Sequence, residues 1–421
     1  MASRAPERGG RPFRVVFLAP EWPPELSTNG IVSYTGAMRE GLAACGVESR
    51  VVSSNVPPAA RDDDVVDLDL VRPSALASLR RHIESRFRPE VAAARDAGGA
   101  LAAALRALHA RWPFDVVELE ETWGLGLAPC RERAFPTLVR LHGPWFLNGA
   151  ALGAVRDGLF ARRDARERRF VADAAGVSAP SADVLARVRD HFGLPLRAAR
   201  VFPNPVRDPG PGQLWRPRAE DPPAVLFVGR FDRHKGGDLA IDAFRAIGAA
   251  HPTAELWFAG PDRGLADGRG GAIGLAAYLA ERIPEADVRA RVKVLGARPR
   301  DDVDALRSRA RVMLVPSRYE VFGMTAAEAL AAGAPLVAAD LGAFRELARD
   351  GEEALLVRPD DAGALAQAAL ALLASPERAA RLGAAARKRY EEAYAPASVA
   401  AAALAFYREA AARRRAEVGA R

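Results

Sequence analysis

The stretch LVPSRYEVFGMTAAEALAAGAPLVAAD, residues 314–340, decides the fold of this chain. Its apolar ends favour buried strands, and residues 324–332 between them favour a helix that ends at Gly333. The same alternation of strand and helix runs through the chain, which favours parallel sheets with helices on both faces. Strands are expected at residues 14–19, 49–53, 115–119, 137–141, 176–179, 224–228, 255–259, 292–295, 312–315, 336–339 and 354–357. Two doubly wound, Rossmann-like α/β domains are the simplest arrangement of these strands.

Two carboxylates in the opening stretch have different roles available in a ligand site. Glu320 lies in the loop after the first strand, and Glu328 lies about one turn inside the helix. Between them, Phe322 and Gly323 lead into the helix N-terminus, whose free N–H groups and positive dipole end favour a phosphate. Carboxylates beside an anion site suit a ligand that carries both hydroxyls and phosphates, and a nucleotide sugar is such a ligand.

A proline-rich segment marks the boundary between two domains. Seven prolines fall within residues 202–223, a composition typical of a stiff linker. We therefore assign residues 1–207 to a first domain, 208–223 to the linker and 224–395 to a second domain. The tail, residues 396–421, is expected to begin as a helix that can pack back on the first domain.

The composition limits the classes of partner. The net charge of +7 comes almost wholly from arginine, because the chain has only three lysines, Lys235, Lys293 and Lys388. Such a chain suits acidic substrates or an anionic membrane surface, and no nucleic acid is expected as a partner. Cys45 and Cys130 show no disulfide or metal spacing. No segment is long and apolar enough for a signal peptide or a membrane span, so a cytoplasmic location is expected.

A glycine-containing loop follows the strand expected at residues 224–228. It reads GRFDRHKGG from residue 229, so that Arg230 can bind two phosphate oxygens and Lys235 adds a point charge. Its spacing does not match a P-loop. The alternative interpretation is a strand-to-helix turn with solvated charges.

Two further candidates lie in the first domain. Gly30 stands before an expected helix and would permit close approach of a ligand, although a purely structural turn is the alternative. His142 follows the strand expected at residues 137–141, at the edge where open α/β sheets bind ligands. A buried histidine with its hydrogen bonds satisfied is the alternative interpretation of His142.

These segments together resemble family 4 of the retaining, nucleotide-sugar-dependent glycosyltransferases. The most specific mark is EVFGMTAAEALAAG, residues 320–333, in which seven residues separate the two carboxylates. Other marks fall in the family's order, namely Gly229-Arg230, Lys235-Gly236, Leu295-Gly296 and Pro316-Ser317. The resemblance covers most of residues 12–395 and implies the GT-B fold, in which two Rossmann-like domains face a central cleft.

The resemblance implies roles for the charged candidates. Arg230 and Lys235 would neutralise the diphosphate leaving group. Glu320 would hold hydroxyls of the transferred sugar, and Glu328 would accept hydrogen bonds from the ribose. Arg298 matches the region where the family's backbone meets the base.

The resemblance implies other roles for uncharged groups. Backbone N–H groups would bind the donor sugar and phosphate at Val321, Phe322, Gly323 and Met324. His142 would face the donor sugar from the first domain, and Gly30 would let a loop approach the diphosphate. The family usually has two adjacent glycines in that loop, whereas here Asn29 precedes Gly30. This departure bears on donor closure or acceptor fit and leaves the class unchanged.

The expected chemistry is a retaining transfer without a metal ion or other cofactor. Cations at the leaving phosphate stabilise the charge that develops there, which is usually the largest catalytic contribution. No cluster of His, Cys and carboxylates has metal-ligand spacing. Asp67-Leu68-Asp69 matches in form the D-x-D of other glycosyltransferases, but a solvated acidic strand is the favoured interpretation. A glycosidase-like pair of Glu320 and Glu328 is rejected, because hydrolysis has no use for the anion site between them.

The acceptor is not identified by the sequence. Two arginine-rich helices could meet an anionic acceptor or the inner face of a membrane, or they could be solvated faces with internal pairs such as Arg163–Glu167. Their arginines are Arg80, Arg81, Arg86 and Arg88 in one, and Arg156, Arg162, Arg163, Arg166, Arg168 and Arg169 in the other. The rival functions are a nucleotide-sugar-binding protein that has lost catalysis and a sucrose- or glycogen-type synthase. A phosphorylase is disfavoured because it would need a lysine for pyridoxal phosphate.

Overall fold

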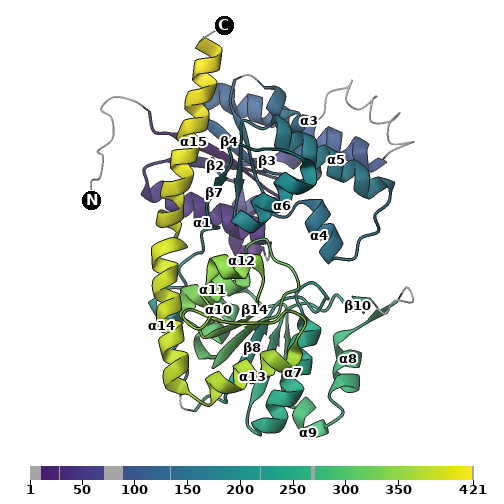
Figure 1. Cartoon of the computed structure of the whole chain (residues 1–421). Helices are drawn as coiled ribbons and strands as arrows, with labels where there is room; N and C mark the ends of the chain where they lie inside the picture. The colour runs from purple at the N-terminus through teal and green to yellow at the C-terminus, as the bar shows by residue number, and fades with distance from the viewer. Residues whose placement is uncertain are drawn as a thin grey trace.

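The protein folds into two α/β domains, each built on one parallel sheet (Figure 1). The structure is a computed structural model that describes residues 11–27, 29–70, 89–132, 134–218, 220–266 and 271–419. The predicted pair of doubly wound, parallel-sheet domains is confirmed.

The first domain contains a seven-stranded sheet in the order β3-β2-β1-β4-β5-β6-β7. Its strands are β1 Arg14–Ala19, β2 Glu48–Ser53, β3 Val65–Asp67, β4 Val116–Glu120, β5 Thr137–Arg140, β6 Gly176–Ala179 and β7 Arg200–Val201. Its helices are α1 Gly30–Ala44, α3 Pro89–Arg111, α4 Trp145–Ala151, α5 Gly158–Asp173 and α6 Ala182–Phe192. The strand order reverses between β1 and β4, and the crevice at such a reversal is where open α/β sheets bind ligands.

The second domain contains a six-stranded sheet in the order β12-β9-β8-β13-β14-β15. Its strands are β8 Ala224–Val228, β9 Glu255–Ala259, β12 Val292–Gly296, β13 Val312–Val315, β14 Leu336–Ala339 and β15 Leu355–Val357, with a separate hairpin of β10 Leu265–Ala266 and β11 Ala272–Ile273. Its helices are α7 Gly237–Ala250, α8 Leu275–Arg282, α9 Ala286–Arg289, α10 Arg300–Arg309, α11 Met324–Ala332, α12 Gly342–Leu347, α13 Ala362–Leu373 and α14 Pro376–Ala393. Here the order reverses between β8 and β13, so the loops after these two strands flank the crevice.

The C-terminal helix α15, Pro396–Gly419, leaves the second domain and runs beside the first (Figure 1). Its apolar residues share one buried cluster with β1 and α1. The hydroxyl of Tyr407 on α15 donates to Glu118 Oε2 on β4 at 2.8 Å, and the hydroxyl of Tyr34 on α1 donates to the other oxygen at 2.5 Å. The last helix therefore completes the core of the first domain.

The proline-rich segment lies against the second domain along part of its length. Trp215 Nε1 donates to the carbonyl of Ala310 at 2.7 Å, and the hydroxyl of Tyr390 donates to the carbonyl of Val206 at 3.0 Å. Only a short part of the segment therefore spans between the domains.

The two domains also meet directly at the N-terminus of α6. The carboxylate of Glu346, on α12, accepts hydrogen bonds from the backbone N–H groups of Ala182 and Asp183 at 2.7 and 2.9 Å. Ser181 Oγ donates to the carbonyl of Val321 at 3.0 Å. This contact brings the loop after β13 against the first domain.

Candidate functional site

The loop after β8 brings Lys235 into contact with Glu320. Gly236 has a φ of 71°, and a Cβ there would collide with the carbonyl oxygen of Pro316, so glycine allows the loops after β8 and β13 to meet. Lys235 Nζ lies 2.6 Å from Glu320 Oε1, and Ser317 Oγ donates to the same oxygen at 2.8 Å. Two of the predicted site residues therefore form a direct ion pair.

This ion pair keeps Glu320 charged. Burial by itself raises the pKa of Glu320, but the Lys235 ammonium and its hydrogen bond outweigh burial, and the pKa lies below its ordinary value. Lys235 and Glu320 therefore neutralise each other across the two loops.

Arg230 is the more accessible cation of the site. Its side chain is 39% exposed, and Nε lies 2.6 Å from Asp232 Oδ2. Asp232 also accepts the backbone N–H of Lys235 at 2.7 Å, which fixes the loop. One residue of this loop was missed by the sequence analysis: His234 Nε2 lies 2.8 Å from the carbonyl of Tyr319 and must donate to it. His234 therefore joins the loop after β8 to the one after β13.

The N-terminus of α11 offers backbone donors beside this pair of loops. Gly323 has a φ of 90°, and a Cβ there would collide with the Phe344 ring, so this sharp entry into the helix requires glycine. In the part of the chain that the structure describes, no group accepts a hydrogen bond from the N–H groups of Val321, Phe322, Gly323 or Met324. These donors lie at or just before the first residue of α11, and the positive end of a helix dipole stabilises an anion.

Gly30 in the first domain lies opposite Met324. A Cβ on Gly30 would stand 3.8 Å from Met324 Cγ, so the two domains approach closely here. Asn29 explains the departure from a double glycine, because its side chain caps α1 by accepting the N–H of Ile31 at 2.9 Å. Thr28 lies outside the described residues.

His142 follows β5, at the carboxyl end of a strand of the first domain's sheet. Its backbone N–H donates to Glu121 Oε2 at 2.8 Å, and its ring packs edge-on against Tyr34 with the centroids 4.7 Å apart. Burial and the nearby Arg140 hold the pKa of His142 well below its ordinary value, so the ring is neutral near pH 7. Among the described residues none forms a hydrogen bond with this ring, which argues against a satisfied core histidine.

A buried carboxylate beneath His142 was also missed by the sequence analysis. Glu121, the residue after β4, accepts hydrogen bonds from the backbone N–H groups of His142 at 2.8 Å and Gly143 at 2.6 Å. Burial, with a further contribution from the neighbouring Glu167, raises the pKa of Glu121 to about 8. The available signal was a pair of glutamates at the end of an apolar strand, where sheet topology places ligand sites.

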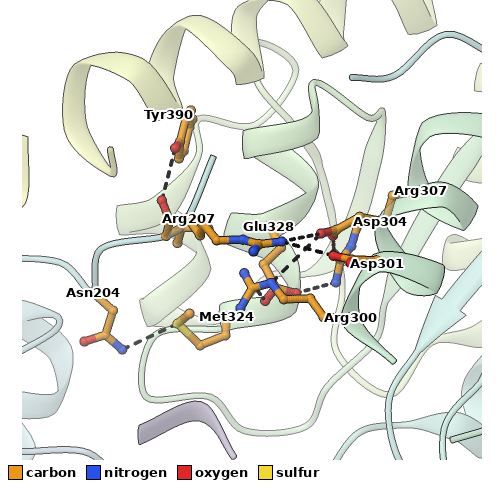
Figure 2. A network of polar contacts seen from close by, with 10 residues as sticks. Asn204, Arg207, Arg300, Asp301, Asp304, Arg307, Met324, Glu328 and Tyr390 are labelled. Carbon is orange, nitrogen blue, oxygen red and sulfur yellow. Dashed lines mark hydrogen bonds and ion pairs between the residues drawn. The ribbon is translucent and has the colours of Figure 1, made fainter. Parts of the chain in front are cut away.

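Glu328 lies apart from Glu320, in a network of polar residues (Figure 2). Arg307 on α10 contacts Glu328 Oε2, and Arg300 Nη2 lies 3.5 Å from Oε1. Arg298 is exposed in the loop before α10, and its side chain joins neither this network nor the Lys235–Glu320 pair. The predicted charged residues therefore fall into two separate groups.

A cavity of about 360 Å³ opens between the domains beside this network. The first domain contributes the loop before α1 and one face of α1, including Trp22 and Arg39. The second domain contributes Pro299, Arg300 and Asp301, and Arg207 comes from the connecting segment. The cavity therefore borders the network that holds Glu328, through Arg207, Arg300 and Asp301.

The interpretation of Asp67-Leu68-Asp69 as a solvated acidic strand is wrong in two respects, because Leu68–Leu70 form a 3-10 helix and Asp67 is buried. Asp67 ends β3, is 7% exposed and pairs with Arg61 at 2.8 Å, while Asp69 is exposed. Over the residues that the structure describes, no group of three or more His, Cys, Asp and Glu side chains is arranged to hold a metal ion.

Four arginines of α5 make contacts within the protein, whereas Arg156, predicted on the same helix, precedes α5 and is exposed. Arg163 pairs with Glu167 at 2.8 Å, as the interpretation of a solvated face with internal pairs expects. Arg169 lies 3.5 Å from Asp173. Arg166 and Arg168 donate to backbone carbonyls at 2.8 and 2.9 Å. The other predicted basic group, Arg80 to Arg88, lies outside the described residues. No helix in the described ranges has both the length and the apolar character to cross a membrane.

Comparisons with known proteins agree with this architecture. Residues 28–208 match the model of Glycosyltransferase Family 4, and residues 216–389 match that of Glycosyl transferases group 1. The D-inositol 3-phosphate glycosyltransferase of Geodermatophilus obscurus is 30% identical over 398 residues, which cover 88% of this chain and 85% of that protein. Sucrose-phosphate synthase from Thermosynechococcus elongatus superposes with a TM-score of 0.67 at 23% identity, over 94% and 98% of the two chains. Anabaena Alr3699/HepE in complex with UDP and glucose gives 0.62 at 16% identity, over 93% and 98%.

The two facing Rossmann-like domains are those of a GT-B enzyme. The chain belongs to the family 4, group 1 glycosyltransferases, and it is a transferase of that class.

Proposed function

We propose that the protein moves a sugar from a nucleoside diphosphate sugar to an acceptor hydroxyl, with retention at the anomeric carbon and without a metal ion. The observation that carries the proposal is the Lys235–Glu320 pair beside the N-terminus of α11. This surface offers cations and N–H donors to a diphosphate, and a carboxylate to sugar hydroxyls. The solved complex of HepE with UDP and glucose, which has a similar fold, supports a donor of this kind.

Donor binding would exchange the ion pairs that the structure shows at the site. The diphosphate would attract Lys235 from Glu320 and Arg230 from Asp232. Glu320 would then be free to accept hydrogen bonds from the transferred sugar. The cations would stand where negative charge grows as the bond to the phosphate breaks, which is where preorganised charge lowers the barrier most.

The chemical step would take place on one face of the sugar. The acceptor oxygen would bond to the anomeric carbon as the bond to the phosphate oxygen breaks. The acceptor proton would pass to the departing phosphate oxygen, so no glycosyl-enzyme forms. Neutral His142 would offer a hydrogen bond to a sugar hydroxyl from the opposite wall. Trapping a sugar on Glu320 or Glu328 would refute this step, and NMR of the product reports the anomeric configuration.

Ligand binding tests the location of the phosphate site. UDP, GDP, ADP and dTDP, each with its sugars, are compared by thermal shift, since a ligand of the native state raises the melting temperature. We expect one nucleotide to raise the melting temperature and Lys235→Ala to abolish that rise. Lys293→Ala is the matched control, because Lys293 is exposed and lies 3.7 Å from Glu255, away from the site. A normal response of Lys235→Ala would mean that the phosphate site is elsewhere.

Turnover tests the remaining parts of the proposal. Release of nucleoside diphosphate from the bound donor would exclude a binding protein without catalysis, and full activity in excess EDTA is expected. Complete loss of activity in EDTA would refute metal independence. Because Arg163, Arg166 and Arg168 of α5 make contacts within the protein, we expect no sedimentation with anionic vesicles at low salt.

A further inference from the structure

Glu328 is held by a buried pair of residues on α10 (Figure 2). Arg307 is 2% exposed, its Nη2 contacts Glu328 Oε2, and its Nη1 lies 2.5 Å from Asp304 Oδ1. Asp304 is itself 5% exposed. A guanidinium is planar and presents its donors in a rigid fork, so a single arginine fixes both carboxylates relative to each other.

This arrangement leaves one oxygen of Glu328 for a ligand. Oε2 is taken by Arg307, whereas Oε1 lies 3.5 Å from Arg300, which is longer than a normal charged hydrogen bond. The Glu328 side chain is 17% exposed, and Arg300 lines the cavity between the domains. Oε1 can therefore accept a hydrogen bond from a hydroxyl that enters from the cleft.

The network extends to the segment that connects the domains. Arg207 lies 3.3 Å from Asp301 and 3.7 Å from Asp304. Together with Arg300, Arg307 and Glu328, the set contains three arginines and three carboxylates, so their formal charges cancel. A balanced network of this kind holds Glu328 in place without adding net charge to the donor site.

We propose that Arg307 is a positioning residue that fixes Glu328 so that its free Oε1 accepts hydrogen bonds from the ribose of the donor. The inference rests on the proposed function, because it assigns the ribose end of the same donor. Asp304 holds the Arg307 guanidinium through Nη1, and Arg307 in turn holds Oε2 of Glu328 through Nη2. Because Oε2 is fixed in this way, the orientation of the Glu328 carboxylate, and so the position of Oε1, depends on Arg307. A lysine at position 307 would keep the charge but could not span both carboxylates.

The test compares ribose nucleotides with nucleotides that lack the ribose hydroxyls. Dissociation constants of UDP, GDP and ADP, and of their 2′,3′-dideoxy counterparts, are measured by calorimetry for the wild type and Arg307→Lys. We expect the wild type to prefer one ribose nucleotide at least tenfold over its dideoxy form, and Arg307→Lys to bring that ratio close to one. A variant that is merely less stable would weaken both ligands alike and keep the ratio.

Arg309→Lys is the matched control on the same helix. Arg309 pairs with the buried Asp221, away from Glu328, so its replacement should leave the ribose ratio unchanged. If Arg307→Lys keeps the wild-type ratio, or Arg309→Lys loses it as well, the positioning role is wrong. If Arg307→Lys does not fold, Asp304→Asn is measured in its place. Its preference for the ribose nucleotide over the dideoxy form should fall at least threefold, and an unchanged preference would overturn the proposal. Absence of binding by the wild type to all three ribose nucleotides would instead refute the proposed function.

Discussion

The two walls of the cleft treat ionisable groups in opposite ways. On the second domain, Lys235 overcomes the effect of burial and lowers the pKa of Glu320, so this wall carries charges. On the first domain, burial and the neighbouring Glu167 carboxylate raise the pKa of Glu121 to about 8. Burial and the nearby Arg140 lower the pKa of His142. Near pH 7, Glu121 is therefore largely protonated and the ring of His142 is neutral. A charged wall suits a diphosphate, and a neutral wall suits the hydroxyls of a sugar and an acceptor.

The difference has a structural cause. Lys235 and Glu320 come from two loops that meet at the cleft, so each buried charge finds an opposite charge. Glu121 accepts hydrogen bonds from the backbone N–H groups of His142 and Gly143, while the carboxylates of Glu167 and Glu120 repel it. Similar glutamates thus become charged or neutral according to the partner that the fold supplies.

The largest expected effect comes from removing a cation of the charged wall. Arg230→Met should lower kcat by a factor on the order of 10²–10³, because it removes a preorganised charge from the leaving phosphate. His142→Ala on the neutral wall should cost about tenfold, the value of one hydrogen bond between uncharged groups. Steady-state kinetics with the donor identified by thermal shift measures both. Equal losses in the two variants would break the comparison between the walls.

The two walls should also respond to pH in opposite directions. Between its ordinary pKa of 4.5 and about 8, folded Glu121 keeps a proton that the unfolded chain releases. This residue therefore lowers the free energy of unfolding as pH rises through that window, by up to about 1.4 kcal/mol per pH unit. Glu320 has a lowered pKa, so its contribution is complete above pH 4.5 and is lost as pH falls below that value.

Urea unfolding at several pH values separates the two contributions. In Glu121→Gln, the free energy of unfolding should fall less steeply with pH between pH 4.5 and 8 than in the wild type, because glutamine does not titrate. Glu320→Gln should instead reduce the loss of stability below pH 4.5. If both variants alter the free energy of unfolding in the same pH range, the contrast between a charged and a neutral wall is wrong.

Much of the fold could be predicted from the sequence, because the buried strands are continuous apolar runs. The runs at residues 14–19, 224–228 and 255–259 became strands with those bounds. Strands β3 and β7 were not predicted, since each has only two or three residues and no periodic pattern can be recognised over that length.

The site could be predicted only where the chemistry lies in one short motif. Glu320 and Lys235 lie in loops that directly follow predicted apolar strands, and the fold brings these two loops together. Arg307 is one of several arginines between residues 298 and 311, and nothing local shows which of them turns inward. That depends on how α10 packs against α11, which is a tertiary property. Asn29 was interpreted only as a departure from a glycine pair, although its position before a helix is typical of an N-cap.

The smallest expected effect concerns Gly30, where the first domain approaches the start of α11. A Cβ on Gly30 would lie 3.8 Å from Met324 Cγ, an ordinary contact, and Gly30 is the first residue of α1. Gly30→Ala should therefore keep or slightly raise the melting temperature, because alanine favours a helix by up to about 1 kcal/mol over glycine. The added methyl group should still raise the KM for the donor a few-fold, since it narrows the gap that the diphosphate would enter.

Gly99→Ala provides the matched control for this prediction. Gly99 is exposed inside α3, and a Cβ there would meet no atom within 4 Å. The substitution should stabilise the protein as an alanine in a helix does, and it should leave the KM for the donor unchanged. A KM that rises in Gly99→Ala, or stays constant in Gly30→Ala, would show that the close approach of the two walls does not limit donor binding. A rise only in Gly30→Ala would mean that the uncharged wall acts through its shape, whereas the charged wall acts through its cations.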